Sequence, residues 1–188
     1  MRMRRKKHGA ERIAACSEIL IPSPIAPAAH PQSFFAEERP VCLEIGCGKG
    51  GFVTGMAEAH PDVNFVAAEI CIDAMVIAVE KVFEKGLKNV KLFNCGAEIL
   101  NYELEKNSID KLYLNFSCPY PKKQYENHRL TYWYFLDIYK YLLKDGAEIH
   151  FKTDNDDFFL FSEQSFLENG FEIIYKTRDL HAENPTDN

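Results

Sequence analysis

Residues 41–51 read VCLEIGCGKGG, a short apolar run that leads directly into a glycine-rich turn. The run at 41–45 predicts a buried strand, and the sequence from Gly51 to Ala59 is compatible with a helix. Glycines let the backbone turn tightly and let a ligand approach closer than a β-carbon would permit. This stretch therefore predicts a strand–turn–helix unit with room for a ligand at its turn.

The rest of the chain, up to residue 180, alternates between strand-like and helix-like runs. Further strands are predicted at residues 64–70, 89–94, 110–116, 147–153 and 171–177. Helices are predicted at residues 73–85, 130–143 and 156–168, with stop signals at Gly86, Gly146 and Gly170. Such alternation is typical of an α/β fold with a doubly wound, mostly parallel, Rossmann-like sheet covered by helices on both faces. Ligands of such sheets bind at the carboxyl ends of the strands.

The chain of 188 residues is long enough for one domain with a sizeable core. We expect residues 41–188 to form that domain and residues 1–40 to be a basic arm and a connector. Five prolines within residues 21–40 predict that the connector lacks regular structure. No apolar run is long enough to span a membrane. None of the six cysteines forms C-x-x-C and no histidine pair has zinc spacing, so we predict no metal site and a reduced, cytoplasmic protein.

The formal net charge of −6 argues against a nucleic-acid partner, but the distribution of the charge does not. Residues 1–12 carry six Lys/Arg and one acid, a local +5, whereas the other 176 residues carry sixteen bases and twenty-seven acids, or −11. A basic arm on an acidic body has two interpretations: a solvated, disordered tail, or an arm that binds the phosphates of a nucleic acid.

The glycine turn also has two interpretations. Gly46, Gly48 and Gly51 match G-x-G-x-x-G, which alone is a weak indication of a nicotinamide dinucleotide site. Glu44 adds an acid two positions before the first glycine, and E-x-G-x-G-x-G is the pattern of S-adenosylmethionine-dependent methyltransferases. That cofactor has no pyrophosphate to place on the helix N-terminus, and its ammonium group favours a nearby carboxylate.

Two further strand ends fit the same class of enzyme. Glu69 lies at the end of the second predicted strand, where a carboxylate can accept both ribose hydroxyls of a nucleoside. In this class the loop after the third strand holds the adenine, and here that loop is NCGAE, residues 94–98.

The loop after the fourth predicted strand, NFSCPYPKK at 115–123, places two prolines around an aromatic residue and is expected to be stiff. His128 and Arg129 follow closely and extend a basic patch. The fifth predicted strand ends in HFKTDN at 150–155, at the same edge of the sheet.

With these motifs the chain resembles the bacterial tRNA (guanine-N7-)-methyltransferase family, whose members share MRMRxK, E-I-G-x-G-K-G, NFSDPWPKK and HFKTDN. The resemblance covers essentially the whole chain and implies methyl transfer from S-adenosylmethionine to N7 of a guanine in tRNA. The implied cofactor contacts are Glu44, Gly46, Gly48, Glu69, Gly96, Ala97 and Cys118. The implied contacts to the substrate guanosine are Lys122 and Asp154, and those to the RNA are Arg4, Arg5, Lys6, Lys123, His128 and Arg129.

Three positions depart from the family pattern: Cys118 and Gly96 replace aspartates, and Tyr120 replaces tryptophan. No catalytic residue is therefore assigned, but N7 of guanine carries a free lone pair, so we expect transfer activity to be retained. A nucleophilic role for Cys118 is disfavoured because no clear basic partner accompanies it. Glu98 can partly replace a lost acid.

The family continues beyond this chain with a substrate-binding segment and a last strand, so we expect a truncated sheet in a monomer or weak homodimer. The main alternative is a tRNA-binding relative with weak or lost transferase activity. A nicotinamide-dependent oxidoreductase is the third interpretation, and it rests on G-x-G-x-x-G alone.

Overall fold

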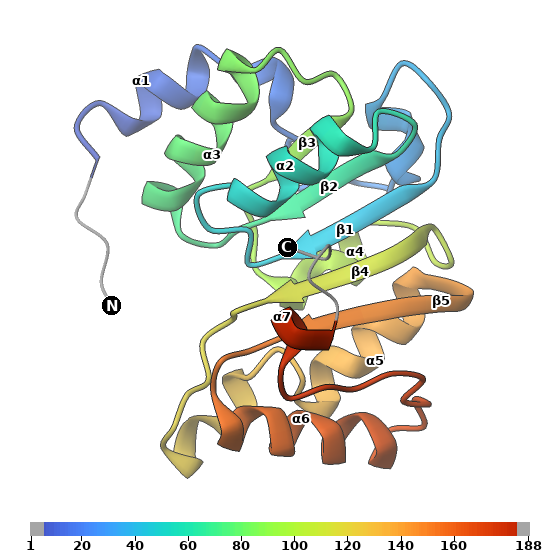
Figure 1. Ribbon diagram of the computed structural model, residues 1–188. Coiled ribbons are helices and arrows are strands. Elements are labelled where there is room, and N and C mark those ends of the chain that lie inside the picture. The colour runs from blue at the N-terminus through green and yellow to red at the C-terminus, as the bar shows by residue number, and fades with distance from the viewer. Residues whose placement is uncertain (1–5, 184–188) are drawn as a thin grey trace.

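Five parallel strands in the order β3-β2-β1-β4-β5 form the sheet of this protein, seen in a computed structural model that describes residues 6–183 (Figure 1). The strands are β1 (Val41–Ile45), β2 (Asn64–Ala68), β3 (Val90–Phe93), β4 (Ile109–Asn115) and β5 (Leu143–Lys152). The helices are α1 (Gly9–Ala14), α2 (Gly51–Ala59), α3 (Ile72–Glu84), α4 (Leu100–Glu103), α5 (Trp133–Leu142), α6 (Asp156–Glu168) and α7 (Leu180–Glu183). The predicted α/β sheet is confirmed, and no helix within residues 6–183 is long and apolar enough to cross a membrane.

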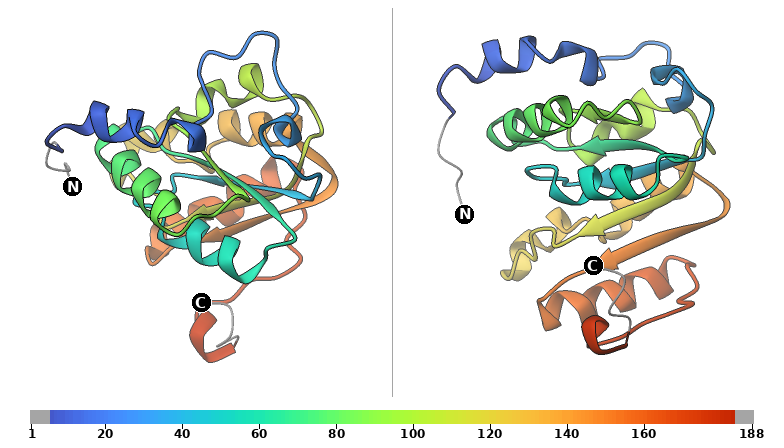
Figure 2. Two further views of the ribbon diagram at one scale, coloured as in Figure 1. Left: turned by 90° about the horizontal axis from the view of Figure 1, so that it is seen from above. Right: turned by 45° about the horizontal axis from the view of Figure 1, so that its top comes forward.

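The central strand β1 separates two hydrophobic cores. Every residue of β1 is buried, and successive side chains of a strand point to opposite faces of the sheet. Leu43 and its β1 neighbours on the same face pack with buried residues of α5, whereas Cys42 packs with buried residues of α2 and α3. The two groups of helices lie on opposite faces of the sheet (Figures 1 and 2). This arrangement leaves the carboxyl ends of the strands open to a ligand.

Gly50 fixes the approach of α2 to α3. A β-carbon at this position would lie 3.0 Å from the β-carbon of Ala78, and the φ angle of +71° is in the left-handed region that favours glycine. Both space and backbone conformation therefore require glycine here, at the end of the turn that follows β1.

From residue 6 onward the N-terminal arm is partly folded, which argues against the interpretation of this part as a solvated tail. Residues Gly9–Ala14 form α1, which lies along α3 (Figure 2). Arg12 donates two hydrogen bonds of 2.6 Å to the Glu80 carboxylate, and the backbone N–H of Lys6 donates to Asp73. Part of the arm's positive charge is thus neutralised by acids of α3.

The connector is also more ordered than its prolines suggest. Pro31–Phe34 form a 3₁₀ turn, and Ile21 is buried in the core that contains α5. Isolated parallel bridges join Leu20 to Leu92 and Ala29 to Leu104. Backbone hydrogen bonds to neighbouring segments therefore hold a stretch that has little secondary structure of its own.

Two predictions for the C-terminal third are wrong. The helix expected to stop near Gly146 ends at Leu142, and Gly146 lies within β5, beside an irregularity in the β4–β5 register. Residues 171–177 form no strand, and the chain there runs clear of the sheet (Figure 1). A strand-like composition is not sufficient, because a strand also needs a partner for its backbone hydrogen bonds. Within the described chain, β5 is consequently an edge of the sheet.

Candidate active site at the carboxyl edge of the sheet

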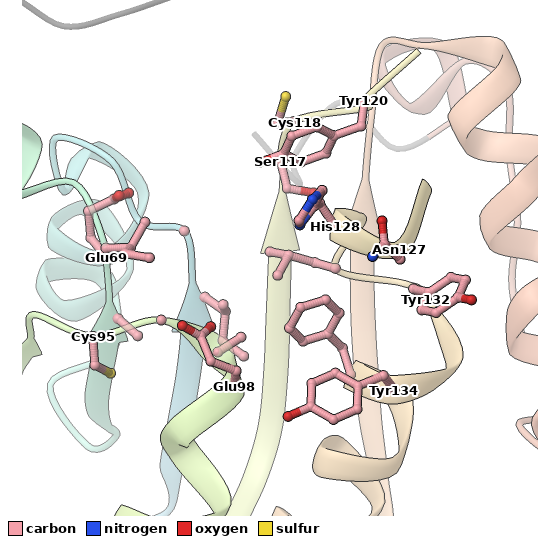
Figure 3. A pocket seen from close by; sticks show the side chains of 18 of the residues that line it. Glu69, Cys95, Glu98, Ser117, Cys118, Tyr120, Asn127, His128, Tyr132 and Tyr134 are labelled. Carbon is pink, nitrogen blue, oxygen red and sulfur yellow. The ribbon is translucent and has the colours of Figure 1, made fainter. Parts of the chain in front are cut away.

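A cavity of about 840 Å³ opens at the carboxyl ends of the strands (Figure 3). Its walls come from the segments that follow β1, β2, β3 and β4 and from the start of α5. The residues of the sequence prediction that line it are Gly46, Glu69, Gly96, Ala97, Cys118 and His128. The cavity lies where parallel sheets of this kind bind their ligands.

The glycine turn after β1 is anchored to β2. The backbone N–H groups of Gly46 and Cys47 donate to the carbonyl oxygen of Ala68, at 2.8 and 3.1 Å. Gly46 and Gly48 have φ angles of +79° and +56°, which a residue with a β-carbon adopts only with strain. The turn thus presents bare backbone to a ligand.

Backbone groups on both sides also orient the Glu69 carboxylate. One oxygen accepts a hydrogen bond of 2.9 Å from the N–H of Gly48, and the other accepts one of 2.7 Å from the N–H of Cys71. Each carboxylate oxygen has a further lone pair, so both can still accept a hydroxyl group. The side chain is fixed in position while its capacity to bind a diol remains.

Glu44 is a buried acid with an incomplete set of partners. Its side chain is 4% exposed, and one oxygen accepts a weak hydrogen bond of 3.4 Å from the amide of Asn115. Burial raises the pKa of Glu44 to about 7, and the Asn115 amide and the nearby backbone N–H of Val53 oppose this shift. The other Glu44 oxygen, the Asn115 amide oxygen and the Ser117 hydroxyl are buried without a hydrogen-bond partner within the described chain.

Buried polar atoms normally have partners, so three unsatisfied ones at one edge of the sheet indicate that a ligand completes them. All three can accept hydrogen bonds, and one is a carboxylate. A ligand with an ammonium group provides the matching donors and charge. The residues present therefore fit the methionine end of S-adenosylmethionine.

The loop after β4 contains two aromatic residues in strained conformations. Phe116 and Tyr120 have φ angles of +49° and +40°, and both line the cavity. Such backbone outliers cluster at binding sites, where the surrounding structure holds them in place. Cys118 lies between them, exposed, on the cavity wall (Figure 3).

Arg129 holds the loop after β4 in place through hydrogen bonds to its backbone. Its guanidinium donates hydrogen bonds to the carbonyl oxygens of Pro119 and Tyr120, at 2.8 and 3.1 Å, and lies 4.4 Å from the ring centre of Phe161. The resemblance implies that Arg129 contacts RNA, but the residue is only 8% exposed. The structure corrects that expectation and makes Arg129 a residue that positions the loop.

Of the other predicted contacts to guanosine and RNA within the described residues, His128 alone lines the cavity. Lys122, Lys123 and His128 are exposed on and beside a 3₁₀ turn (Lys123–His128), and of these His128 reaches the cavity wall. Asp154 is exposed just after β5, and the N-cap of α6 is Asn155, whose side chain accepts from Phe158. Arg4 and Arg5 lie outside the described residues.

Sequence reasoning missed the aromatic wall of the cavity. Tyr132, Trp133, Tyr134 and Phe135 line it at the start of α5, and Trp133 is 51% exposed. The signal in the sequence is the run TYWYF at 131–135, directly after the basic loop, which the sequence pattern assigns only to the predicted helix at 130–143. Within residues 6–183, no group of three or more metal-ligating side chains occurs.

Comparison with solved structures supports the fold. An antibiotic-related methyltransferase matches with a TM-score of 0.59 and 21% sequence identity, covering 75% of this chain and 71% of that one. An S-adenosylmethionine-dependent methyltransferase from Aquifex aeolicus matches with a TM-score of 0.55 and 16% identity, covering 88% and 89%. At these identities the likeness concerns the fold alone.

Comparison with sequences goes further. Residues 38–187 match a family described as "Putative methyltransferase". The tRNA (guanine-N(7)-)-methyltransferase of Geobacillus kaustophilus is 42% identical over 188 residues, which is all of this chain and 87% of that protein. Its counterpart in Streptococcus pneumoniae is 40% identical over 182 residues, or 97% of this chain and 86% of that protein. This chain belongs to the family of tRNA (guanine-N(7)-)-methyltransferases.

Proposed function

We propose that this protein transfers the methyl group of S-adenosylmethionine to N7 of a guanine in tRNA. The observation that carries the proposal is the set of unsatisfied acceptors around Glu44, beside a cavity with the oriented Glu69 carboxylate on its wall. These features match the ammonium and the ribose of one elongated ligand, and the family relationship identifies which ligand that is.

The cofactor would lie along the edge from β1 to β3. Glu44 and the turn around Gly46 would hold its ammonium group, and Glu69 would hold the ribose hydroxyls. The base would then reach the loop after β3, where Gly96 and Ala97 line the cavity. When bound, S-adenosylmethionine supplies a methyl group on a positively charged sulfur.

The reaction needs positioning more than proton transfer. N7 of guanine is an unprotonated ring nitrogen with its lone pair in the ring plane, so the N–C bond forms as the C–S bond breaks and no proton is removed. Correct placement of the reacting atoms contributes on the order of 7–11 kcal/mol in the best cases. A general base, worth roughly 10²–10⁴-fold in rate, is not required. Cys118 at the family's aspartate position is therefore compatible with transfer.

The RNA would approach from the side of the β4 and β5 loops. The exposed Lys122, Lys123 and His128 suit phosphate contacts, and the aromatic side chains around the cavity suit stacking on an unpaired base. Asp154 is an acceptor that can pair with the N1–H and 2-amino group of guanine. The basic residues at the start of the chain, Lys6 among them, would add phosphate contacts.

The test uses the full chain, S-adenosylmethionine with a labelled methyl group, and bulk tRNA that lacks N7-methylguanosine. We expect the label to appear as N7-methylguanosine in nuclease digests, and to persist in Cys118→Ser, because no nucleophile is required. Binding of S-adenosylhomocysteine and tRNA without any N7-methylguanosine, at any enzyme concentration, would favour the second candidate, a tRNA-binding relative without transfer activity. The replacements at Gly96 and Cys118 are the observation that keeps this candidate in view.

A further inference from the structure

The loop after β3 places the carboxylate of Glu98 in the cavity, in the space left by the missing side chain of Gly96. A β-carbon built on Gly96 would collide with the carboxylate of Glu98, so this carboxylate fills the space that a side chain at position 96 would take. The backbone at Gly96 is extended (φ −84°, ψ 161°), a conformation that any residue adopts. Only the far end of the exposed Glu98 side chain stands in the way, so a side chain at position 96 would displace this carboxylate without straining the backbone.

The Glu98 carboxylate faces the cavity without a partner. Figure 3 shows it on the cavity side of its loop, across from the aromatic wall that includes Tyr134. Within the described chain, no hydrogen-bond or ion-pair partner accompanies it. Glu44, Glu69 and Glu98 belong to β1, the end of β2 and the loop after β3, so they follow the order of the strands along the edge.

We propose that Glu98 accepts a hydrogen bond from the 6-amino group of the cofactor's adenine and thereby selects an adenine nucleoside. This inference rests on the proposed function, which places the ribose at Glu69 and the base at the loop after β3. The 6-amino group carries the only polar hydrogens of a nucleoside-bound adenine, and an ionised carboxylate can only accept hydrogen bonds. A contact between Glu98 and the base must therefore involve that group.

The experiment compares two ligands on the full chain by calorimetry. One is S-adenosylhomocysteine, and the other is its analogue in which hydrogen replaces the 6-amino group. Because a hydrogen bond to a charged group is lost with the analogue, the unmodified protein should bind S-adenosylhomocysteine about 10- to 100-fold more tightly. Glu98→Ala should lower the affinity for S-adenosylhomocysteine and leave the affinity for the analogue unchanged, so that the preference for the 6-amino group disappears.

Gly96→Ala is a second variant, which keeps the Glu98 carboxylate but places a methyl group in the space that this carboxylate occupies. The added methyl group displaces the Glu98 side chain, so the preference for the 6-amino group should fall although no acid has been removed. Glu105→Ala is the matched control, because Glu105 is an exposed glutamate after α4 and does not line the cavity. It removes the same charge and should leave the preference unchanged.

The outcomes separate the two proposals. If Glu98→Ala lowers the affinity for both ligands by the same factor or changes neither affinity, the preference for the 6-amino group remains. Glu98 then does not contact that group, and only this inference is overturned. If the unmodified protein binds neither ligand, the proposed function fails and the inference fails with it.

Discussion

The two sides of the cavity are built in opposite ways. On the β1–β3 side, backbone N–H groups orient Glu69, the glycine turn is bonded to β2, and Glu44 is buried. On the side of the β4 loop and α5, exposed aromatic and basic side chains dominate, and one buried arginine, Arg129, braces the loop. The difference matches the proposed function, in which fixed groups on one side hold a small cofactor and exposed groups on the other side meet a large RNA.

The two sides also differ in what their charged groups cost the folded protein in free energy. Burial makes the ionisation of Glu44 unfavourable, and in the proposed function the ammonium group of the cofactor offsets this cost. Exposed lysines such as Lys123 cost the folded state little, and each contributes little to affinity. If the two sides are independent, a substitution on one side should leave binding to the other side unchanged.

The largest effect is expected for Glu69→Ala. The variant removes a carboxylate that we propose accepts both ribose hydroxyls, and two hydrogen bonds to a charged group are worth roughly 3–5 kcal/mol together. Affinity for S-adenosylhomocysteine, measured by calorimetry, should fall by a few hundred-fold or more. The control is Glu84→Ala, an exposed acid at the end of α3, which should bind as the unmodified protein does. Unchanged affinity in Glu69→Ala would place the ribose elsewhere.

The second prediction concerns the pH dependence of stability. The pKa of Glu44 is raised from 4.5 to about 7 in the folded protein, so between these values the folded state holds a proton that the unfolded state has lost. Stability is therefore greatest at low pH and falls as the pH rises. From about pH 5.5 to about pH 8 this group alone should lower the free energy of unfolding by about 2 kcal/mol.

Glu44→Gln removes that titration and serves as the comparison in urea unfolding at both pH values. As the pH rises, the unmodified protein should lose stability relative to Glu44→Gln. Affinity of the unmodified protein for S-adenosylhomocysteine should increase as the pH rises through about 7, because the ionised Glu44 attracts the ammonium group. If the stability of the two proteins depends on pH in the same way, the pKa of Glu44 is not raised in the folded state.

The third prediction separates the two sides through Arg129. Removing the guanidinium in Arg129→Ala deletes two hydrogen bonds to the loop and its packing on Phe161, and should lower stability by about 2 kcal/mol. Methyl transfer to tRNA should fall, while affinity for S-adenosylhomocysteine should remain, because Arg129 does not line the cavity.

Arg178→Ala is the matched control for that experiment. Arg178 also lies over a phenylalanine of α6, at 4.5 Å from the Phe159 ring centre, but it is exposed and pairs with Asp156. Its loss should cost less than about 1 kcal/mol and leave transfer unchanged. An equal loss of cofactor affinity and transfer in Arg129→Ala would mean that the two sides of the cavity are coupled.

These contrasts also explain what the sequence could predict. The residue ranges of β1, α2 and α6 agree with the prediction, because each has a clear local signal: an apolar run in β1, a glycine turn before α2, and a glycine stop signal after α6. The positions of Glu44 and Glu69 followed from the same local logic, since both stand at strand ends.

The errors occurred where distant residues decide the structure. Residues 171–177 have the composition of a strand, but no local pattern reveals whether a partner strand is present. Arg129 has the sequence context of a surface arginine, and only the fold places Phe161 beneath it. The sequence suggests that Glu98 can replace a lost acid, but the place of its carboxylate beside Gly96 depends on how a short loop folds back on itself.

The smallest effect is expected at the RNA-facing surface. Lys123 is exposed beside the β4 loop, and as a phosphate contact it should contribute to tRNA affinity mainly through the release of counterions. In Lys123→Ala the slope of log affinity against log salt concentration should decrease in magnitude by about 0.7–0.9, with only a few-fold loss of affinity at low salt. Lys88→Ala is the matched control, because Lys88 is also exposed but precedes β3, at the opposite edge of the sheet. If both variants change the slope equally, tRNA responds to the overall charge of the protein, and the contrast between the two sides of the cavity does not extend to the RNA.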